Sequence, residues 1–415
     1  MSFSDISKYF LHFFSNNGNN IQKTIVSNKN KVIFKKFHNL LNKNENYVNN
    51  NNIPIKNINF INDKRSVIRR FGFLNTSNIF LSEKIQKNII NQMTSINTFS
   101  IKINNILFTI NIFLLNYVNK NVDMMKDKII RLLYFLSNYI TNDALKTVEI
   151  NIIQLDLKKK LPMNNKVLDS YNVNTGVTWA CKPRGEIVIY RKEEWFKVLI
   201  HELFHSTCLD FSNLNISKSM KNKITELFFI KHCKFDISET YSEFWANTIN
   251  SILISYEFTN NNFNKFLKQF EMFHTIEKYF SIFQCIKVLH HMNLNYNIIT
   301  SDRNYHKQLS IRNYSEKTNV FAYYILKMVW LFNINDMIAF FSNRNKNIIN
   351  SNKDIKYVYD LIELTGNLYK NNKLLSAIQN YSSKISQLNM GLPNQLSTNV
   401  ELMRSLRMSV IEDEN

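Results

Sequence analysis

Glycine and proline are scarce in this chain, with 6 Gly and 4 Pro among 415 residues. An all-β protein with many tight turns is therefore not expected, because these two residues supply the backbone angles that such turns need. Helical periodicity is found instead in long stretches at residues 124–140, 237–256, 263–291, 319–332 and 354–381. We predict an α+β protein that is mostly α-helical, with a small mixed sheet.

Cysteine is also scarce, and its 4 residues are widely spaced without a CxxC pair. This spacing gives no sign of a disulfide framework or of a cysteine-rich zinc site. We expect Cys181, Cys208, Cys233 and Cys285 to be free thiols in a reducing, cytoplasmic compartment, where small buried packing is the usual role of a free cysteine.

Acidic residues are outnumbered, with 32 Asp and Glu against 52 Lys and Arg, which gives a formal net charge of +20. A basic balance of this size suggests nucleic-acid binding. However, the basic residues are spread along the chain, and Lys, Asn and Ile are all abundant, as in proteins of AT-rich genomes. We expect some affinity for polyanions from charge alone, and no dedicated nucleic-acid binding.

Long apolar runs are missing as well. Residues 103–118 are interrupted by asparagines and are too short and too polar to span a membrane, so we expect a buried helix or strand there. Residues 6–14 have an amphipathic pattern but lack the basic start and the cleavage site of a signal peptide. No membrane span is predicted.

One complete motif is present, the HExxH sequence at residues 201–205. Its two imidazoles lie four residues apart on one helical face, so both can reach a single zinc ion at about 2.0–2.1 Å. Glu202 projects toward the open position of the metal, where it can accept a proton from a bound water. His201, Glu202 and His205 therefore suit metal-assisted hydrolysis of an amide bond.

The residues before the motif fit this interpretation. Residues 185–190 are apolar and β-branched, which predicts a short strand. A helix follows from near Glu193, with an acidic first turn and a buried stripe of Trp195, Val198 and Leu199. Strand, short turn and HExxH helix is the order expected of a zincin.

The third metal ligand is not part of the motif. An extended metzincin pattern needs glycine at 208 and histidine at 211, and the chain has Cys208 and Phe211. Asp210 lies one residue short of the position used by an Asp-ligated variant, and we interpret it as a loop or capping residue. The remaining candidates are glutamates further along the chain, namely Glu226, Glu239 and Glu243.

Glu239 and Glu243 lie at i and i+4 of a predicted helix that Asp236 caps, so they share one face. One carboxylate can bind the metal while the other accepts a hydrogen bond from a ligating imidazole. Glu226 has no such partner acid.

These motifs resemble gluzincins, the zinc metallopeptidases with HExxH and a distant glutamate ligand. The chain is similar to uncharacterised HExxH proteins of large nucleocytoplasmic DNA viruses. The resemblance covers about residues 145–410 and is carried by 174–178, 190–197, 201–205, 209–211 and 239–246, more weakly by 318–324 and 406–409. It implies a zincin-like core with Glu239 as the third zinc ligand and Glu243 supporting an imidazole, while Glu226 and Glu243 remain alternative ligands.

Length, composition and the periodic stretches suggest how the chain is divided. We expect an Asn/Lys-rich, partly looped segment at 1–65, a helical lobe at 66–145 and the zincin-like core at 146–256. A helical C-terminal lobe would follow at 257–395, and a tail with a solvated acidic end at 396–415.

A strand beside the metal has a further expected role. Residues 147–155 alternate like a strand, and 172–179 predict another one that contains Gly176. In zincins an edge strand pairs with the extended substrate, and 174–178 are our candidate for that edge. The alternative is an ordinary sheet strand with a bulge.

In the implied reaction, Glu202 takes a proton from a zinc-bound water and passes it to the leaving amine. A second group must stabilise the oxyanion. We predict Tyr324 for this role, with alternatives at Tyr323, Arg312, His290 and His291.

Two classes of function agree with these residues. The first is a zinc-dependent endopeptidase that hydrolyses a protein or peptide substrate in a host cytoplasm or in a virion, with virion components as partners. The second is a virion-associated structural protein that keeps a zincin fold with little or no turnover. The intact Glu202 favours the first.

Substitution of Glu239 and of Glu226 tests which of the two is the third metal ligand. Glu239→Ala is expected to weaken zinc binding far more than Glu226→Ala, because the first removes a ligand and the second an ordinary helical surface charge. The zinc content of the dialysed proteins measures both effects. The reverse order would refute the assignment of Glu239 as the third ligand.

Overall fold

The structure of the protein is a computed structural model that describes residues 3–16, 21–50, 54–59, 64–75, 81–116, 121–163, 166–259, 261–388 and 396–412. It is an α+β structure with many helices and one mixed sheet, which confirms the predicted class. Its contacts divide the chain into two compact units. We call residues 39–158 and 175–209 the sheet unit, and residues 1–38, 159–174 and 210–414 the helical unit.

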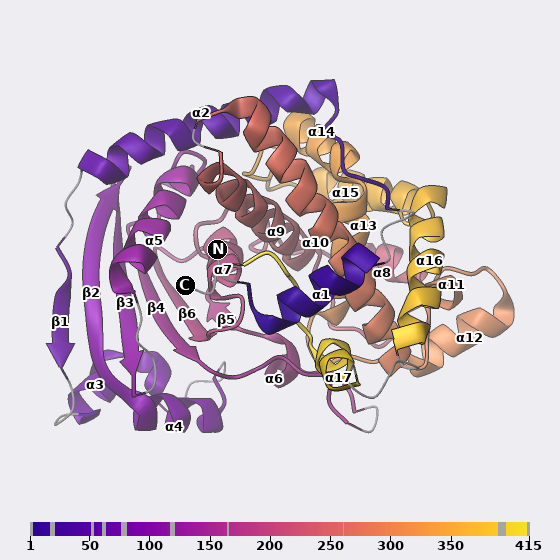
Figure 1. Cartoon of the computed structure of the whole chain (residues 1–415), viewed down its shortest axis with the longest axis horizontal. Coiled ribbons are helices and arrows are strands. Elements are labelled where there is room, and N and C mark those ends of the chain that lie inside the picture. Colours follow the sequence, from indigo (N-terminus) through magenta and orange to yellow (C-terminus); the bar gives the residue numbers. More distant parts are fainter. Residues whose placement is uncertain are drawn as a thin grey trace. The chain divides into compact units, whose positions relative to one another are not determined.

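The sheet unit holds six described strands in the order β1-β2-β3-β4-β6-β5 (Figure 1). The pairs β1/β2, β2/β3 and β5/β6 are antiparallel, while β3/β4 and β4/β6 are parallel. The strands are β1 (Lys56–Asn59), β2 (Met93–Ile103), β3 (Ile106–Leu115), β4 (Thr147–Leu155), β5 (Gly176–Thr178) and β6 (Arg184–Arg191). The predicted strand at 147–155 is confirmed, and most of the apolar stretch at 103–118 is strand β3.

The hairpin between β2 and β3 turns at Asn104 and Asn105, whose φ angles of 47° and 65° are left-handed. Asparagine tolerates this conformation better than most residues, which explains its place in the middle of an apolar stretch. The asparagines that exclude a membrane span thus include the two that make the turn.

Helices cover the sheet within its own unit. A core cluster joins Val67, Phe73 and Ile89 of the helical segments to apolar residues on β2, β3, β4 and β6. Helix α7 contacts β4, β5 and β6, and α5 contacts β2. The helical segments of this unit are α3 (Lys64–Arg70), η2 (Gly72–Leu74), α4 (Glu83–Gln92), α5 (Val122–Ser137) and α7 (Trp195–Ser206).

The helical unit is built around α10 (Phe263–His291), which contacts α9, α13, α16 and α1. The predicted helices at 237–256 and 263–291 are confirmed. Helix α2 (Asn28–Asn50) contributes residues to both units. The other elements are α1 (Asp5–Asn16), α6 (Ser170–Val173), α8 (Lys218–Leu227), α9 (Ile237–Glu257), α11 (Tyr296–Ile299), α12 (Asn304–Asn313), η3 (Phe321–Leu326), α13 (Lys327–Phe332), α14 (Ile334–Arg344), α15 (Ile355–Leu368), α16 (Asn372–Leu388) and α17 (Leu396–Arg404).

The single helix predicted at 354–381 is wrong, because the structure has two helices, α15 and α16. The backbone N–H of Lys373 donates to Oδ1 of Asn371 at 2.9 Å. An asparagine side chain that caps the first turn in this way starts a new helix.

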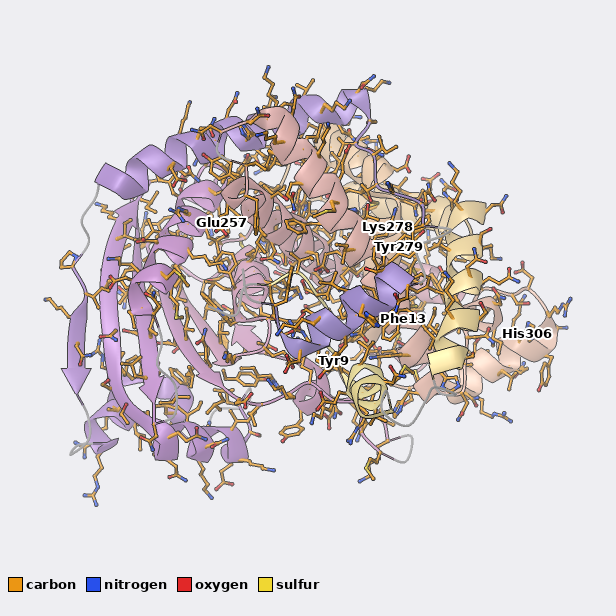
Figure 2. The ribbon with its side chains drawn as sticks, viewed as in Figure 1. Tyr9, Phe13, Glu257, Lys278, Tyr279 and His306 are labelled. Carbon is orange, nitrogen blue, oxygen red and sulfur yellow. A yellow bond between two sulfur atoms is a disulfide. The ribbon has the colours of Figure 1, made fainter. Side chains whose placement is uncertain are left out.

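The N-terminal segment packs on α10. The ring centroids of Phe10 and Phe280 lie 4.8 Å apart, and those of Phe14 and Tyr279 lie 5.9 Å apart; Figure 2 labels Tyr279 on α10. Both backbone groups of Gln22 are bound there, since its N–H donates to the Tyr279 hydroxyl and its carbonyl accepts from Lys278 Nζ, each at 2.7 Å. The asparagine-rich residues 17–20 and 51–53 lie outside the described part of the chain.

The C-terminal residues 405–411 are buried in the helical unit and form no regular helix or strand, apart from an isolated bridge between Ser405 and Lys160. Side chains satisfy its backbone: the Tyr324 hydroxyl and Gln284 Nε2 donate to the carbonyls of residues 406 and 407, each at 2.6 Å. Glu277 Oε1 accepts from the N–H groups of residues 410 and 411. The expectation of a solvated tail end is wrong for Ile411, which is buried, and for Glu412, which forms an ion pair with Arg407.

Within the described residues, no single helix reaches the length and hydropathy of a membrane span. The bent pair Phe321–Phe332 and Ile334–Arg344, with 92° between its helices, meets that test only when both are taken together.

The buried His274 gives a pH-dependent test of the helical unit. Burial, reinforced by Lys278, lowers the pKa of His274 from 6.5 to about 3. Between pH 6.5 and pH 3 the imidazole of His274 takes up a proton only in the unfolded chain. Its contribution to the free energy of unfolding is therefore complete above pH 6.5 and is lost as the pH falls toward 3. At pH 5 the loss is about 2 kcal/mol.

We expect His274→Asn to remove this loss. The difference in unfolding free energy between variant and wild type, measured by urea unfolding, should move by about 2 kcal/mol in favour of the variant between pH 8 and pH 5. A difference that does not change with pH would show that the imidazole is protonated equally in both states.

Candidate metal centre

Helix α7 carries the HExxH motif and is buried along its whole length. It begins at Trp195, later than the predicted start near Glu193, because Glu194 is left-handed with a φ of 59° and cannot be part of the helix. The predicted stripe is confirmed, since Trp195, Val198 and Leu199 are all buried. The motif therefore lies on a rigid element that packs on the sheet.

The two histidines of the motif face each other. Nε2 of His201 lies 3.1 Å from Nε2 of His205, and both side chains are almost completely buried. Two zinc–nitrogen bonds of about 2.0–2.1 Å at a tetrahedral angle place their nitrogens roughly 3.3 Å apart. The spacing of this pair therefore suits one shared metal ion.

Glu202 lies on the side of α7 that meets β5. A Cβ atom on Gly176 would lie 2.7 Å from Ile189 Cδ1, 3.0 Å from Val198 Cγ1 and 3.1 Å from Glu202 Cγ, so a larger residue there would require these side chains to shift. The buried hydroxyl of Tyr190 belongs to the same environment: burial, together with the nearby charge of Glu202, raises the pKa of Tyr190. Strand β5 and the Glu202 side chain are thus direct neighbours in the sheet unit.

The strand predicted at 172–179 is shorter than expected. A capping box on Asp169 starts helix α6, which includes residues 172 and 173, and β5 begins only at Gly176. β5 is the last strand of the described sheet and pairs antiparallel with β6. The predicted edge strand is confirmed for Gly176–Thr178.

The C-terminal end of α7 is a Schellman motif. The N–H of Leu209 donates to the Phe204 carbonyl at 2.9 Å, and the N–H of Cys208 donates to the His205 carbonyl at 3.2 Å. Cys208 has a φ of 59°, at the position where helices usually have glycine.

Cys208 forms a disulfide with Cys181, with Cα atoms 4.9 Å apart. The expectation of free thiols is therefore wrong for this pair, while Cys233 and Cys285 are free. The two residues are 27 positions apart, and the fold brings them together where the chain between β5 and β6 meets the end of α7. Closing a loop of this length stabilises the folded state by about 3–4 kcal/mol in the chain-entropy description.

The carboxylate candidates lie in the helical unit. Asp236 caps α9 as predicted, since its side chain accepts from the Ser238 N–H at 2.9 Å, and Glu239 follows in the first turn. Oε2 of the partly exposed Glu239 accepts a hydrogen bond from the Tyr323 hydroxyl at 2.8 Å. Glu243, one turn later, pairs with Lys327 at 3.3 Å, and both side chains are 2% exposed.

The Glu239–Tyr323 and Glu243–Lys327 contacts repeat one turn apart along the same pair of helical segments. Glu239 and Glu243 are one turn apart on α9, and Tyr323 and Lys327 are one turn apart on η3 and α13. The segment η3 is a π-helix, a form that is often found at functional sites. Lys327 Nζ also donates to the carbonyl of Met408 at 2.7 Å, so Lys327 links Glu243 to the buried C-terminal segment.

Other predicted residues lie elsewhere. The Tyr324 hydroxyl donates to the Leu406 carbonyl at 2.6 Å. Glu226 is exposed at the end of α8, and the buried Asp210 accepts hydrogen bonds from Ser212 and Ser242. Among the oxyanion alternatives, His290 and Arg312 are exposed, and His291 bonds the Lys166 carbonyl.

Among the described residues, the structure brings together one group with metal-ligand spacing. One ligand atom from each of His201, His205 and Glu239 lies within 4.8 Å of the other two, and neither Glu226 nor Glu243 belongs to this group. Two imidazole nitrogens and one carboxylate oxygen form a donor set that suits zinc and leaves a fourth position open.

Sequence reasoning did not name Lys327, and it ranked Tyr323 below Tyr324. A signal was present, because Tyr323 and Lys327 repeat the i, i+4 spacing of Glu239 and Glu243. A lysine inside the apolar stretch 319–332 also indicates a buried acidic partner, since an isolated buried charge is costly.

No family model, curated protein or solved structure matches the chain. The similarity to gluzincins consequently depends on the motifs and on the geometry described above. It stays a prediction, as does a viral origin.

Proposed function

We propose that this protein is a zinc-dependent peptidase whose metal is bound by His201, His205 and Glu239. The observation that carries the proposal is the convergence of their three ligand atoms within 4.8 Å. The chemical type of these donors supports zinc, because imidazole and carboxylate are its usual ligands at catalytic sites. The HExxH order supports hydrolysis, because it places a carboxylate next to the first ligand.

Each residue of the motif then has a defined task. Zinc at such a site lowers the pKa of a bound water toward 7. Glu202 would accept the proton of that water and pass it to the leaving amine. The nearly complete burial of Glu202 supports this role, because a poorly solvated carboxylate is a stronger base than a solvated one.

Glu239 would be oriented through Tyr323. Oε2 of Glu239 accepts the hydrogen bond of the tyrosine hydroxyl, which would orient the carboxylate that binds the metal. Glu243 and Lys327 hold the next turn of α9 through a buried ion pair, which keeps the helix from rotating. Outer contacts of this type commonly change metal affinity 10- to 100-fold.

The edge strand β5 suits an extended peptide substrate. In the described sheet it pairs with β6 on one side only, and the Glu202 helix packs directly on it at Gly176. An extended chain could add to the outer side of β5 through main-chain hydrogen bonds, which favours affinity for peptides without strict sequence preference.

The base assignment is tested by Glu202→Gln. We expect the cleavage of an unfolded protein to fall about 10²- to 10⁴-fold, because the general base is lost. The zinc content should remain near one ion per chain, since this substitution removes no metal ligand. Glu226→Gln is the matched control and should keep full activity.

If Glu202→Gln cleaves as fast as wild type, either a contaminant is responsible or another group is the base. A wild type that binds zinc and cleaves no peptide would instead favour the structural alternative.

The two neighbouring tyrosines provide a second test. Tyr323→Phe is expected to weaken zinc binding about 10-fold or more, because Glu239 loses the hydroxyl that orients it. Tyr324→Phe should leave zinc affinity unchanged and destabilise the fold by about 1–3 kcal/mol, because the buried Leu406 carbonyl loses its donor. Zinc affinity by chelator competition and urea unfolding measure the two effects.

The same two variants test the prediction that Tyr324 stabilises the oxyanion. If Tyr324 stabilises the oxyanion, Tyr324→Phe will lower kcat with zinc fully bound. Equal zinc affinity in Tyr323→Phe and wild type would contradict the orienting role of Tyr323.

A further inference from the structure

The disulfide at the end of the HExxH helix has no role in the proposed hydrolysis. We propose that Cys181 and Cys208 form a reversible thiol–disulfide site that fixes the end of α7 and thereby controls its affinity for the metal. The statement about metal affinity rests on the proposed function, whereas the statement about the helix end does not.

The first argument is the hydrogen bonding of both cysteines. The N–H of Cys181 donates to the His205 carbonyl at 3.0 Å, and the N–H of Cys208 donates to the same oxygen at 3.2 Å. The residue that accepts both hydrogen bonds is the second histidine of the motif. Both cysteines of the disulfide therefore bind the backbone carbonyl of a proposed metal ligand.

The second argument is the backbone conformation. Cys181 and Cys208 have φ angles of 56° and 59°, in the left-handed region that L-residues with a Cβ atom disfavour. Glycine would fit the helix end at position 208 better. The disulfide accounts for cysteines at these two positions, because it holds both residues in the left-handed conformation. Once that bond is open, the end of α7 is expected to fray.

The third argument is the reach of the bond. The closed loop runs from just beyond β5, through β6 and the whole of α7, to Cys208. One covalent link thus connects the end of the edge strand to the end of the motif helix. Opening it would loosen β5 and His205 together.

The chemistry requires an accessible bond and a reductant. Both sulfur-bearing side chains are partly exposed, in contrast to the buried Cys285. A dithiol reductant attacks one sulfur as a thiolate, which breaks the S–S bond, forms a mixed disulfide and releases the other cysteine as a thiolate that takes up a proton. The second thiol of the reductant then displaces the first cysteine. Two electrons pass to the protein, which gains two thiols, while the reductant becomes a cyclic disulfide.

The test compares the oxidised and reduced full-length protein. Thiols are counted by maleimide labelling and mass spectrometry, and zinc affinity is measured by competition with a chromophoric chelator after the reductant has been removed. We expect the oxidised protein to bind zinc at least tenfold more tightly than the reduced protein. The double variant Cys181→Ser/Cys208→Ser should bind like the reduced protein under both conditions.

The matched control is Cys233→Ser/Cys285→Ser, which removes the two free cysteines and should keep the full redox response. Because the first double variant could fold poorly, hydrogen exchange of the amides at 203–209 is measured on the wild type as well. Reduction should accelerate exchange there more than in β4 of the same unit.

Equal zinc affinity in the two redox states of a protein that binds zinc would overturn the proposal, as would the absence of a Cys181–Cys208 link after oxidation. If neither form binds zinc, the proposed function fails. Hydrogen exchange then decides the remaining part: faster exchange on reduction supports control of the helix end, and unchanged exchange overturns it.

Discussion

The close packing of α7 on the edge of the sheet is the constraint on which the candidate site depends. Leu199, Ile200 and Phe204 are fully buried, and each contributes about 1.5–3 kcal/mol through removal of apolar surface from water. The contacts of α7 with β4, β5 and β6 hold the helix, and with it both imidazoles, in one orientation. The absence of a side chain at Gly176 contributes to this packing, because a Cβ atom there would press on Ile189, Val198 and Glu202.

A second constraint operates inside the helical unit, where the irregular C-terminal segment and several charged side chains are buried together. Glu277, Lys287 and Lys327 are each less than 5% exposed and all bind backbone groups near the C-terminus. Burial raises the pKa of Glu277 and lowers that of Lys287, so both ions depend on these hydrogen bonds. Because Lys327 also pairs with Glu243, the C-terminal segment stabilises the helix that carries Glu239.

The imidazoles and the carboxylate of the proposed centre are both positioned by packed residues. The imidazoles are positioned by a buried helix, and the carboxylate is positioned by a tyrosine that donates to one of its oxygens. In each case the orienting groups are packed residues rather than mobile surface side chains. Pre-organisation of this kind lets a metal bind without first ordering its ligands, which lowers the entropic cost of binding.

Local patterns in the sequence determined the HExxH register, the helices α9 and α10, the strand β4 and the Asp236 cap, because periodicity and capping involve residues only a few positions apart. Tertiary structure decided the rest. The Cys181–Cys208 bond joins residues 27 positions apart, and the choice between Tyr323 and Tyr324 depends on which of two adjacent hydroxyls meets a carboxylate 84 positions away. The break between α15 and α16, in contrast, is set by a local cap at Asn371, which apolar periodicity alone does not reveal. The cysteine and tyrosine contacts are created by packing between distant positions, which the local pattern of the chain does not specify.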